Sequence, residues 1–121
     1  MEKQNMKVLI IEDNKNPIIK VIPNRLDTLR KIVGNNHIEV VKYKDILLVF
    51  DEDAYKKLLP VNREIDGLNI RGIFVITGND KKNQDFKDLT EEQIEEYTKE
   101  FEIEQEKEQE QELEQEGEEM E

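Results

Sequence analysis

Acidic side chains follow two apolar stretches of this 121-residue chain and could together hold a divalent cation. Glu12 and Asp13 come directly after "KVLII", and Asp51, Glu52 and Asp53 come directly after "ILLVF". Carboxylate oxygens are the ligands that Mg²⁺ prefers in proteins. If the two stretches are neighbouring strands that point the same way, their acids converge. The chemistry would then be metal-dependent phosphotransfer.

A phosphorylation receiver domain would use such acids, with Asp51 as the phosphate acceptor and Thr77 as its hydroxyl residue. A receiver alternates strands and helices, so a long helix should follow Asp13. The sequence instead has Pro17 and the alternating "IIKVI", which leaves too few residues for that helix before Pro23. The phosphotransfer enzyme remains a remote alternative, and we expect a protein without catalysis, bound metal or other cofactor.

A second group of polar residues could bind an anion. The guanidinium of Arg63 is a planar fork suited to phosphate or carboxylate, and the amide of Asn62 both donates and accepts hydrogen bonds. With Arg71, Thr77 and Gly78 in the same half of the chain, they predict a polar pocket for an anionic ligand such as a nucleotide. Alternatively, Arg63 fastens its own loop to backbone carbonyls or to a local acid, and Asn62 forms an Asx-turn.

The acidity of the chain lies at its C-terminal end. Of the net charge of -12, residues 102–121 contribute -10 through 11 Glu and one Lys, whereas residues 1–90 are nearly neutral at +2. We expect residues 1–101 to form a single domain. Residues 102–121 predict a disordered or frayed helical tail, because alternating Glu places like charges four residues apart. Such a tail is either a solvated extension or an arm that binds a basic partner.

Apolar patterning predicts strands and helices in one domain. Five stretches rich in β-branched residues predict strands: Met6–Glu12, Pro17–Ile22, Ile38–Tyr43, Ile46–Phe50 and Ile70–Gly78. Residues 51–69, which include Pro60 and Gly67, predict a helical turn and an extended loop. A polar loop is expected after the fifth strand.

Two helices complete the expected fold. Residues 23–34 predict a short helix with Asn24 as its cap, Asp27 three residues later and Gly34 at its end. Residues 90–101 predict a longer helix with a Thr90–Gln93 capping box. The fold class is therefore α+β: a mainly antiparallel sheet of about five strands with two helices packed on it.

Several stretches carry a family likeness: "MKVLIIE", "LDTLRKIVG" leading to "IEVV", "LPVNR", "IRGIFVITG" and "LTEEQIEEY". Over about residues 6–101 the chain resembles the domain-of-unknown-function family 3846 of phages, plasmids and conjugative elements. Asn62 and Arg63 match the family's central segment, whereas Val61 stands where a second proline is often found. The resemblance implies an accessory protein of a mobile element with no established chemistry.

The leading hypothesis is a non-enzymatic binding protein with a role in counter-defence. It would hold an anionic small molecule, such as a nucleotide-like signal, or a host protein through the region of Asn62, Arg63 and Arg71. The alternative is an interaction module whose acidic tail binds a basic partner surface.

Composition narrows the setting in which this protein would act. The chain has no cysteine, no apolar run of membrane-spanning length and no basic stripe. We therefore expect a cytoplasmic protein with no membrane partner and no nucleic-acid partner. Free sheet edges would allow two copies to pair as a homo-oligomer.

Overall fold

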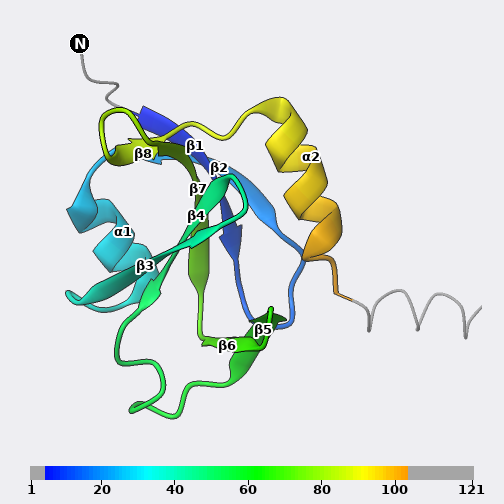
Figure 1. The fold of residues 1–121 in the computed structure, drawn as a ribbon. Coiled ribbons are helices and arrows are strands. Elements are labelled where there is room, and N and C mark those ends of the chain that lie inside the picture. Colours follow the sequence, from blue (N-terminus) through cyan, green and yellow to red (C-terminus); the bar gives the residue numbers. More distant parts are fainter. Residues whose placement is uncertain (1–4, 104–121) are drawn as a thin grey trace, which may run out of the picture.

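A sheet with one helix on each face is the framework of the structure (Figure 1). The computed structural model describes residues 5–103. The strands are β1 (Asn5–Ile11), β2 (Ile18–Pro23), β3 (Ile38–Tyr43), β4 (Ile46–Asp51), β5 (Val61–Ile65), β6 (Leu68–Arg71), β7 (Phe74–Asp80) and β8 (Asp85–Lys87). The helices are α1 (Leu26–Val33) and α2 (Glu91–Glu100).

The main sheet has the order β2-β1-β7-β4-β3, and all of its neighbouring strands are antiparallel. β8 pairs with the end of β7, while β5 and β6 form a separate hairpin. Because β7 runs against both of its neighbours, β1 and β4 are parallel to each other with β7 between them. The predicted α+β class with a mainly antiparallel sheet is confirmed.

Alternation along the strands divides the apolar side chains between two core layers. Leu9, Phe74 and Ile76 face α2, where they join the buried Tyr97 and Phe101. The opposite face packs on α1 through a second cluster: Met6, Val8, Ile10, Ile22, Leu29, Val33, Val49 and Val75. The inner strand β4 is buried along its whole length because both of its faces are covered.

All five predicted strands are present, and three further strands were missed. The loop expected within residues 51–69 contains β5, and it leads directly into β6. The fifth predicted strand is divided at Gly72, whose φ of 75° breaks it into β6 and β7. A Cβ at Gly72 would lie 2.8 Å from Leu59 Cδ1, so the side chain of Leu59 closely approaches this glycine.

The predicted caps are right for α2 and wrong at the start of α1. Thr90 and Gln93 form the capping box of α2, and Gly34 ends α1 with a left-handed φ of 83°. However, α1 has Arg25 at its N-cap with no side-chain hydrogen bond. The Asn24 amide instead donates to the Phe86 carbonyl at 3.4 Å, because the chain entering α1 passes beside β8.

Side chains at the turn between β3 and β4 hold α2 against the sheet. The carboxylate of Asp45 accepts hydrogen bonds from the Tyr97 hydroxyl and, at 2.8 Å, from the Gln93 amide. These bonds lower the pKa of Asp45, and the bond from Tyr97 has the largest effect.

Within residues 5–103, no helix has the length and apolar content needed to cross a membrane.

Gly78 lies where the segment after β8 crosses the sheet. A Cβ at this position would be 2.4 Å from the carbonyl oxygen of Asp88 and 2.9 Å from that of Lys87. The crossing segment is itself held by β1, because Leu89 N–H donates to the Lys7 carbonyl at 2.9 Å. The backbone therefore has no room to move away from a side chain at Gly78.

Gly78→Ala should lower the free energy of unfolding by roughly 1–3 kcal/mol, because the new methyl group overlaps backbone oxygen atoms. Urea denaturation measures the change. Gly67→Asn is the matched control: Gly67 has nothing within 4 Å of its Cβ direction, and asparagine tolerates its φ of 82°. Equal losses in the two variants would contradict the steric explanation.

Asp45→Asn should flatten the loss of stability in acid. The lowered pKa of Asp45 means that its stabilisation is complete above the unfolded-state pKa of about 3.9 and is lost as pH falls through the folded-state value. Urea unfolding across the acid range measures this slope. Asp66→Asn, in the exposed turn between β5 and β6, should leave the slope unchanged.

Candidate functional site

Arg63 fastens three segments of the chain that are far apart in sequence. Its Nε and Nη2 donate to the Phe101 carbonyl at 3.1 and 2.8 Å, and Nη2 also donates to the Lys15 carbonyl at 2.7 Å. Nη1 donates to the carbonyl and side-chain oxygens of Asn62 at 3.0 and 2.6 Å. These five bonds use all five N–H donors of the guanidinium.

Asn62 extends the same network into the sheet. This residue is 8% exposed, and its amide donates to the carbonyls of Ile11 at 2.8 Å and Gly72 at 2.9 Å. The side-chain oxygen accepts from Arg63, so the Asn62 side chain links the end of β1 to the break between β6 and β7. Its donors and acceptor are engaged inside the protein.

The charge of Arg63 lies at a favourable place for a cation. Phe101 is the C-cap of α2, where the unpaired carbonyls carry partial negative charge. Burial lowers the pKa of Arg63, while the nearby charge of Asp13 acts in the opposite direction. An anionic ligand at this guanidinium would have to displace backbone carbonyls that it already binds.

The other residues of the predicted pocket lie at different places. Arg71 donates to the Leu59 carbonyl at 2.9 Å, and its guanidinium carbon lies 5.2 Å from the centroid of the Tyr55 ring. Thr77 is fully buried within β7. At about 3.3 Å per residue, Thr77 and Gly78 lie roughly 17–20 Å along the chain from Gly72, which contacts Asn62.

The carboxylate of Asp51 forms an ion pair with Lys57 of the same chain. Asp51 is 2% exposed and accepts hydrogen bonds from Lys57 Nζ at 2.7 Å, Asn35 Nδ2 at 2.6 Å and Asp53 N–H at 2.8 Å. Burial acts to raise the pKa of Asp51, but these bonds outweigh it and lower the pKa. Neither Asn35 nor Lys57 was singled out from the sequence.

The two acidic strand ends point the same way but are not neighbours. Glu12 follows β1 and Asp51 ends β4, and β7 separates these parallel strands, so their ends lie roughly 10 Å apart. Glu12 forms an ion pair with Lys15 at 3.2 Å. In the part of the chain that the structure describes, no three His, Asp or Glu side chains lie close enough to hold a metal ion.

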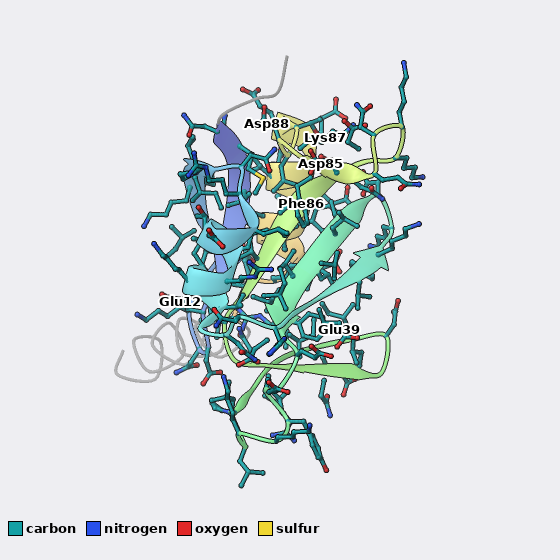
Figure 2. All side chains as sticks on the ribbon, turned by 90° about the vertical axis from the view of Figure 1, so that its left-hand side faces the viewer. Glu12, Glu39, Asp85, Phe86, Lys87 and Asp88 are labelled. Atoms are coloured by element: carbon teal, nitrogen blue, oxygen red, sulfur yellow. The ribbon has the colours of Figure 1, made fainter. Side chains whose placement is uncertain are left out.

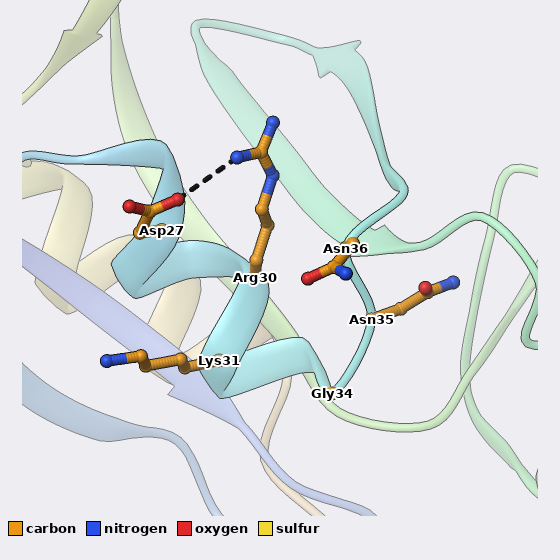
Figure 3. Close-up of a pocket in the computed structure, with 6 residues that line it drawn as sticks. All are labelled: Asp27, Arg30, Lys31, Gly34, Asn35 and Asn36. Atoms are coloured by element: carbon orange, nitrogen blue, oxygen red, sulfur yellow. Dashed lines mark hydrogen bonds and ion pairs between the residues drawn. The ribbon is translucent and has the colours of Figure 1, made fainter.

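A shallow polar pocket of about 470 Å³ lies beside the C-terminal end of α1 (Figure 3). Asp27, Arg30, Lys31, Asn35 and Asn36 line it, together with Gly34. The Arg30 guanidinium forms an ion pair with Asp27 at 3.1 Å, so part of the positive charge is already neutralised. The pocket has no apolar side chain on which the body of an organic ligand could pack.

A larger cleft of about 540 Å³, the β8 cleft, lies on the α1 face where the helix no longer covers the sheet. Figure 2 looks onto this face, with Phe86 and Asp85 of β8 above α1. The strand registers place Val40 beside Val49, Lys42 beside Leu47 and Asn79 beside Phe86 on this same face. The lining residues are Val40, Lys42, Leu47, Asn79, Lys81, Gln84, Asp85 and Phe86.

The β8 cleft combines an apolar floor with a polar rim. Val40, Leu47 and the half-buried Phe86 provide apolar surface. Among the described residues, the ammonium groups of Lys42 and Lys81 form no ion pair. Ligand sites in proteins typically have this size and this mixture of an apolar lining with a few polar groups.

Sequence reasoning missed the β8 cleft because its residues come from separate elements. The alternation of "IEVVKY" indicates that Val40 and Lys42 share a face. The signal for β8 is weaker, since three residues with one aromatic side chain resemble the surrounding polar loop. Only the pairing of β8 with β7 brings Phe86 to this face.

Comparison with known proteins identifies the family. The sequence matches the family described as Domain of unknown function (DUF3846) over residues 6–102, which is most of the chain. The chain belongs to the DUF3846 family. No curated protein and no solved structure matches it. The DUF3846 match covers both the Arg63 network and the β8 cleft.

Arg63→Ala in this DUF3846 domain should lower the free energy of unfolding by about 3 kcal/mol, because partly buried carbonyls lose a charged donor. Arg63→Lys should recover little, since an ammonium group cannot reproduce the fork. Urea denaturation measures both variants. Arg71→Ala is the control, with an expected loss of about 1 kcal/mol from one hydrogen bond and one ring contact. An unchanged midpoint in Arg63→Ala would mean that the guanidinium is available to a ligand.

Proposed function

We propose that this protein is a non-enzymatic binding protein for a small anionic molecule with a planar apolar part, such as a nucleotide. The ligand would occupy the β8 cleft rather than the region of Asn62 and Arg63. The single observation that supports this choice is that Lys42 and Lys81, at the rim of an apolar cleft, form no ion pair within the described residues 5–103. At Arg63, by contrast, every donor is already used.

The floor of the β8 cleft suits a flat ring system. Phe86 offers an aromatic surface, and stacking of a nucleobase on an aromatic side chain contributes about 1–3 kcal/mol. Val40 and Leu47 continue the apolar surface across β3 and β4. The amides of Asn79 and Gln84 can donate to and accept from polar edges of the ring.

The rim supplies the attraction for negative charge. Lys42 comes from β3 and Lys81 from the turn between β7 and β8, so two separate elements bring positive charge to the lining of the cleft. Each ammonium provides three donors on a flexible stem and acts as a point charge. Asp85 is the one carboxylate in the lining, and it favours a ligand that also presents a donor.

The lining supports binding rather than catalysis. It contains no His, Cys, Ser, Thr or Tyr, so it lacks the usual pairing of a nucleophile with a base. Asp85 accepts its neighbour's N–H at 2.7 Å and has no second acid beside it in the cleft.

We extend the proposal to the setting that the family resemblance suggests. In a phage or other mobile element, a protein that sequesters a nucleotide signal of its host would act in counter-defence. The chemistry of such a signal, an aromatic base with phosphate groups, is the chemistry that the β8 cleft suits. A cytoplasmic location would follow from that role.

Adenosine 5′-diphosphate is a suitable first probe. Its binding can be measured through the amide chemical shifts of the full-length protein. Resonances of β3, β8 and the turn between β7 and β8 should move. Lys42→Ala and Lys81→Ala should each weaken binding by about tenfold or more, since a hydrogen bond to a charged group contributes about 1.5 kcal/mol. Lys82→Ala is the matched control, because Lys82 is exposed on the same turn but does not line the cleft.

Two further probes separate the parts of the site. Adenosine without phosphate should bind more weakly and be insensitive to Lys81→Ala, and pyrophosphate should bind without shifting the Phe86 ring resonances. Equal weakening by Lys81→Ala and Lys82→Ala would indicate general electrostatic attraction and contradict the proposed cleft. Shifts confined to residues near Arg63 would return the site to the originally predicted region.

A further inference from the structure

The outer edge of β2 is an unpaired strand edge with an apolar surface. β2 ends the main sheet and pairs only with β1 in the described part of the chain. Its side chains Ile18, Ile19 and Val21 are 44%, 54% and 60% exposed. Only Ile22 of this strand is buried, and it belongs to the apolar cluster between the sheet and α1.

The edge strand β2 has few of the features that usually prevent pairing. Edge strands are commonly protected by charges, prolines, bulges or covering elements. β2 carries one charge, Lys20, and one proline, Pro23 at its last position, and its register with β1 is continuous from Asn5–Pro23 to Ile10–Ile18. The opposite edge strand, β3, carries both Glu39 and Lys42.

We propose that β2 pairs with β2 of a second copy, antiparallel and across a two-fold axis. The two main sheets would then join into one continuous path of ten strands. Backbone N–H and C=O groups along the outer edge of β2 would form the new ladder. This homodimer is independent of the proposed ligand, because the β8 cleft lies on β3, β4, β7 and β8.

Self-pairing suits the side chains of this strand. Residues directly opposite each other in an antiparallel pair lie on the same face of the sheet. The two-fold axis must therefore pass midway between one residue and the same residue of the second copy. An axis at Ile19 or Val21 places β-branched side chains opposite each other, which is favourable. With either axis, the two copies of Lys20 do not lie directly opposite each other.

The charge beyond the domain favours the antiparallel arrangement of the two copies. The N–H of Ile103 donates to the side chain of Asn16 at 3.0 Å, so the chain leaves the domain beside the start of β2. Residues 104–121 carry a net charge of -9. Antiparallel pairing about Ile19 or Val21 places the two exits roughly 20 Å apart or more, beyond the screening length of about 8 Å at physiological salt. Parallel pairing would bring the two exits together.

A contact limited to one strand from each copy is small, so the dimer should be weak and depend on concentration. Sedimentation of the full chain should show a mass rising from 14.4 kDa toward twice that value as concentration increases. Val21→Lys should abolish the rise by placing a charge within the paired edge. Val40→Lys, on the opposite edge strand, is the matched control and should leave the rise intact, since Val40 is 43% exposed.

Single cysteines give a second test because the chain has none of its own. Of Ile19→Cys and Val21→Cys, the variant nearest the axis should oxidise to a disulfide-linked dimer, whereas Val40→Cys should not. A chain that stays monomeric at all concentrations would overturn the proposal, as would equal cross-linking of Val40→Cys. If the protein stays monomeric and its β2 amide resonances shift only when an extended peptide is added, the edge binds a foreign strand. That result would also overturn the proposed homodimer.

Discussion

The guanidinium of Arg63 connects segments of the fold that are far apart in the sequence. It binds the carbonyl of Lys15 in the first hairpin, that of Phe101 at the end of α2 and both oxygens of Asn62 in the β5–β6 hairpin. Sheet pairing cannot supply these links, because β5 and β6 lie outside the main sheet. The position of α2 over its face of the sheet thus depends on charge-assisted hydrogen bonds from Arg63 at one end and on Asp45 at the other.

Local patterns explain which parts of the fold were predictable from sequence. The five strands of the main path are rich in β-branched residues, and α2 has a capping box and an apolar stripe, so local patterns identify them. β5, β6 and β8 are short and polar, and they form only because tertiary partners are already present. The wrong cap on α1 has the same origin, since Asn24 is drawn to the carbonyl of Phe86.

The candidate site was harder to predict, because residue types with obvious chemistry are used internally. The charged groups of Arg63 and Asp51 are satisfied by backbone carbonyls, by an amide and by Lys57, so their chemistry stabilises the fold. The β8 cleft uses ordinary residues, two lysines and one phenylalanine among them, whose value comes from their arrangement. A sequence shows residue types and spacing along the chain, whereas this cleft depends on which strands become neighbours.

The position of β7 in the sheet also has a consequence during synthesis of the chain. β1 and β4 are complete long before β7 is made, yet each finds its inner neighbour only in β7. At about 5–20 residues per second, the 62 residues between Ile11 and Phe74 take roughly 3–12 s to synthesise. Both hairpins, β1–β2 and β3–β4, are complete only once Asp51 has been made, so they coexist without β7 for the last 22 of these residues, roughly 1–4 s. Until β7 at residues 74–80 has been made, the inner edges of β1 and β4 therefore lack their partner strand.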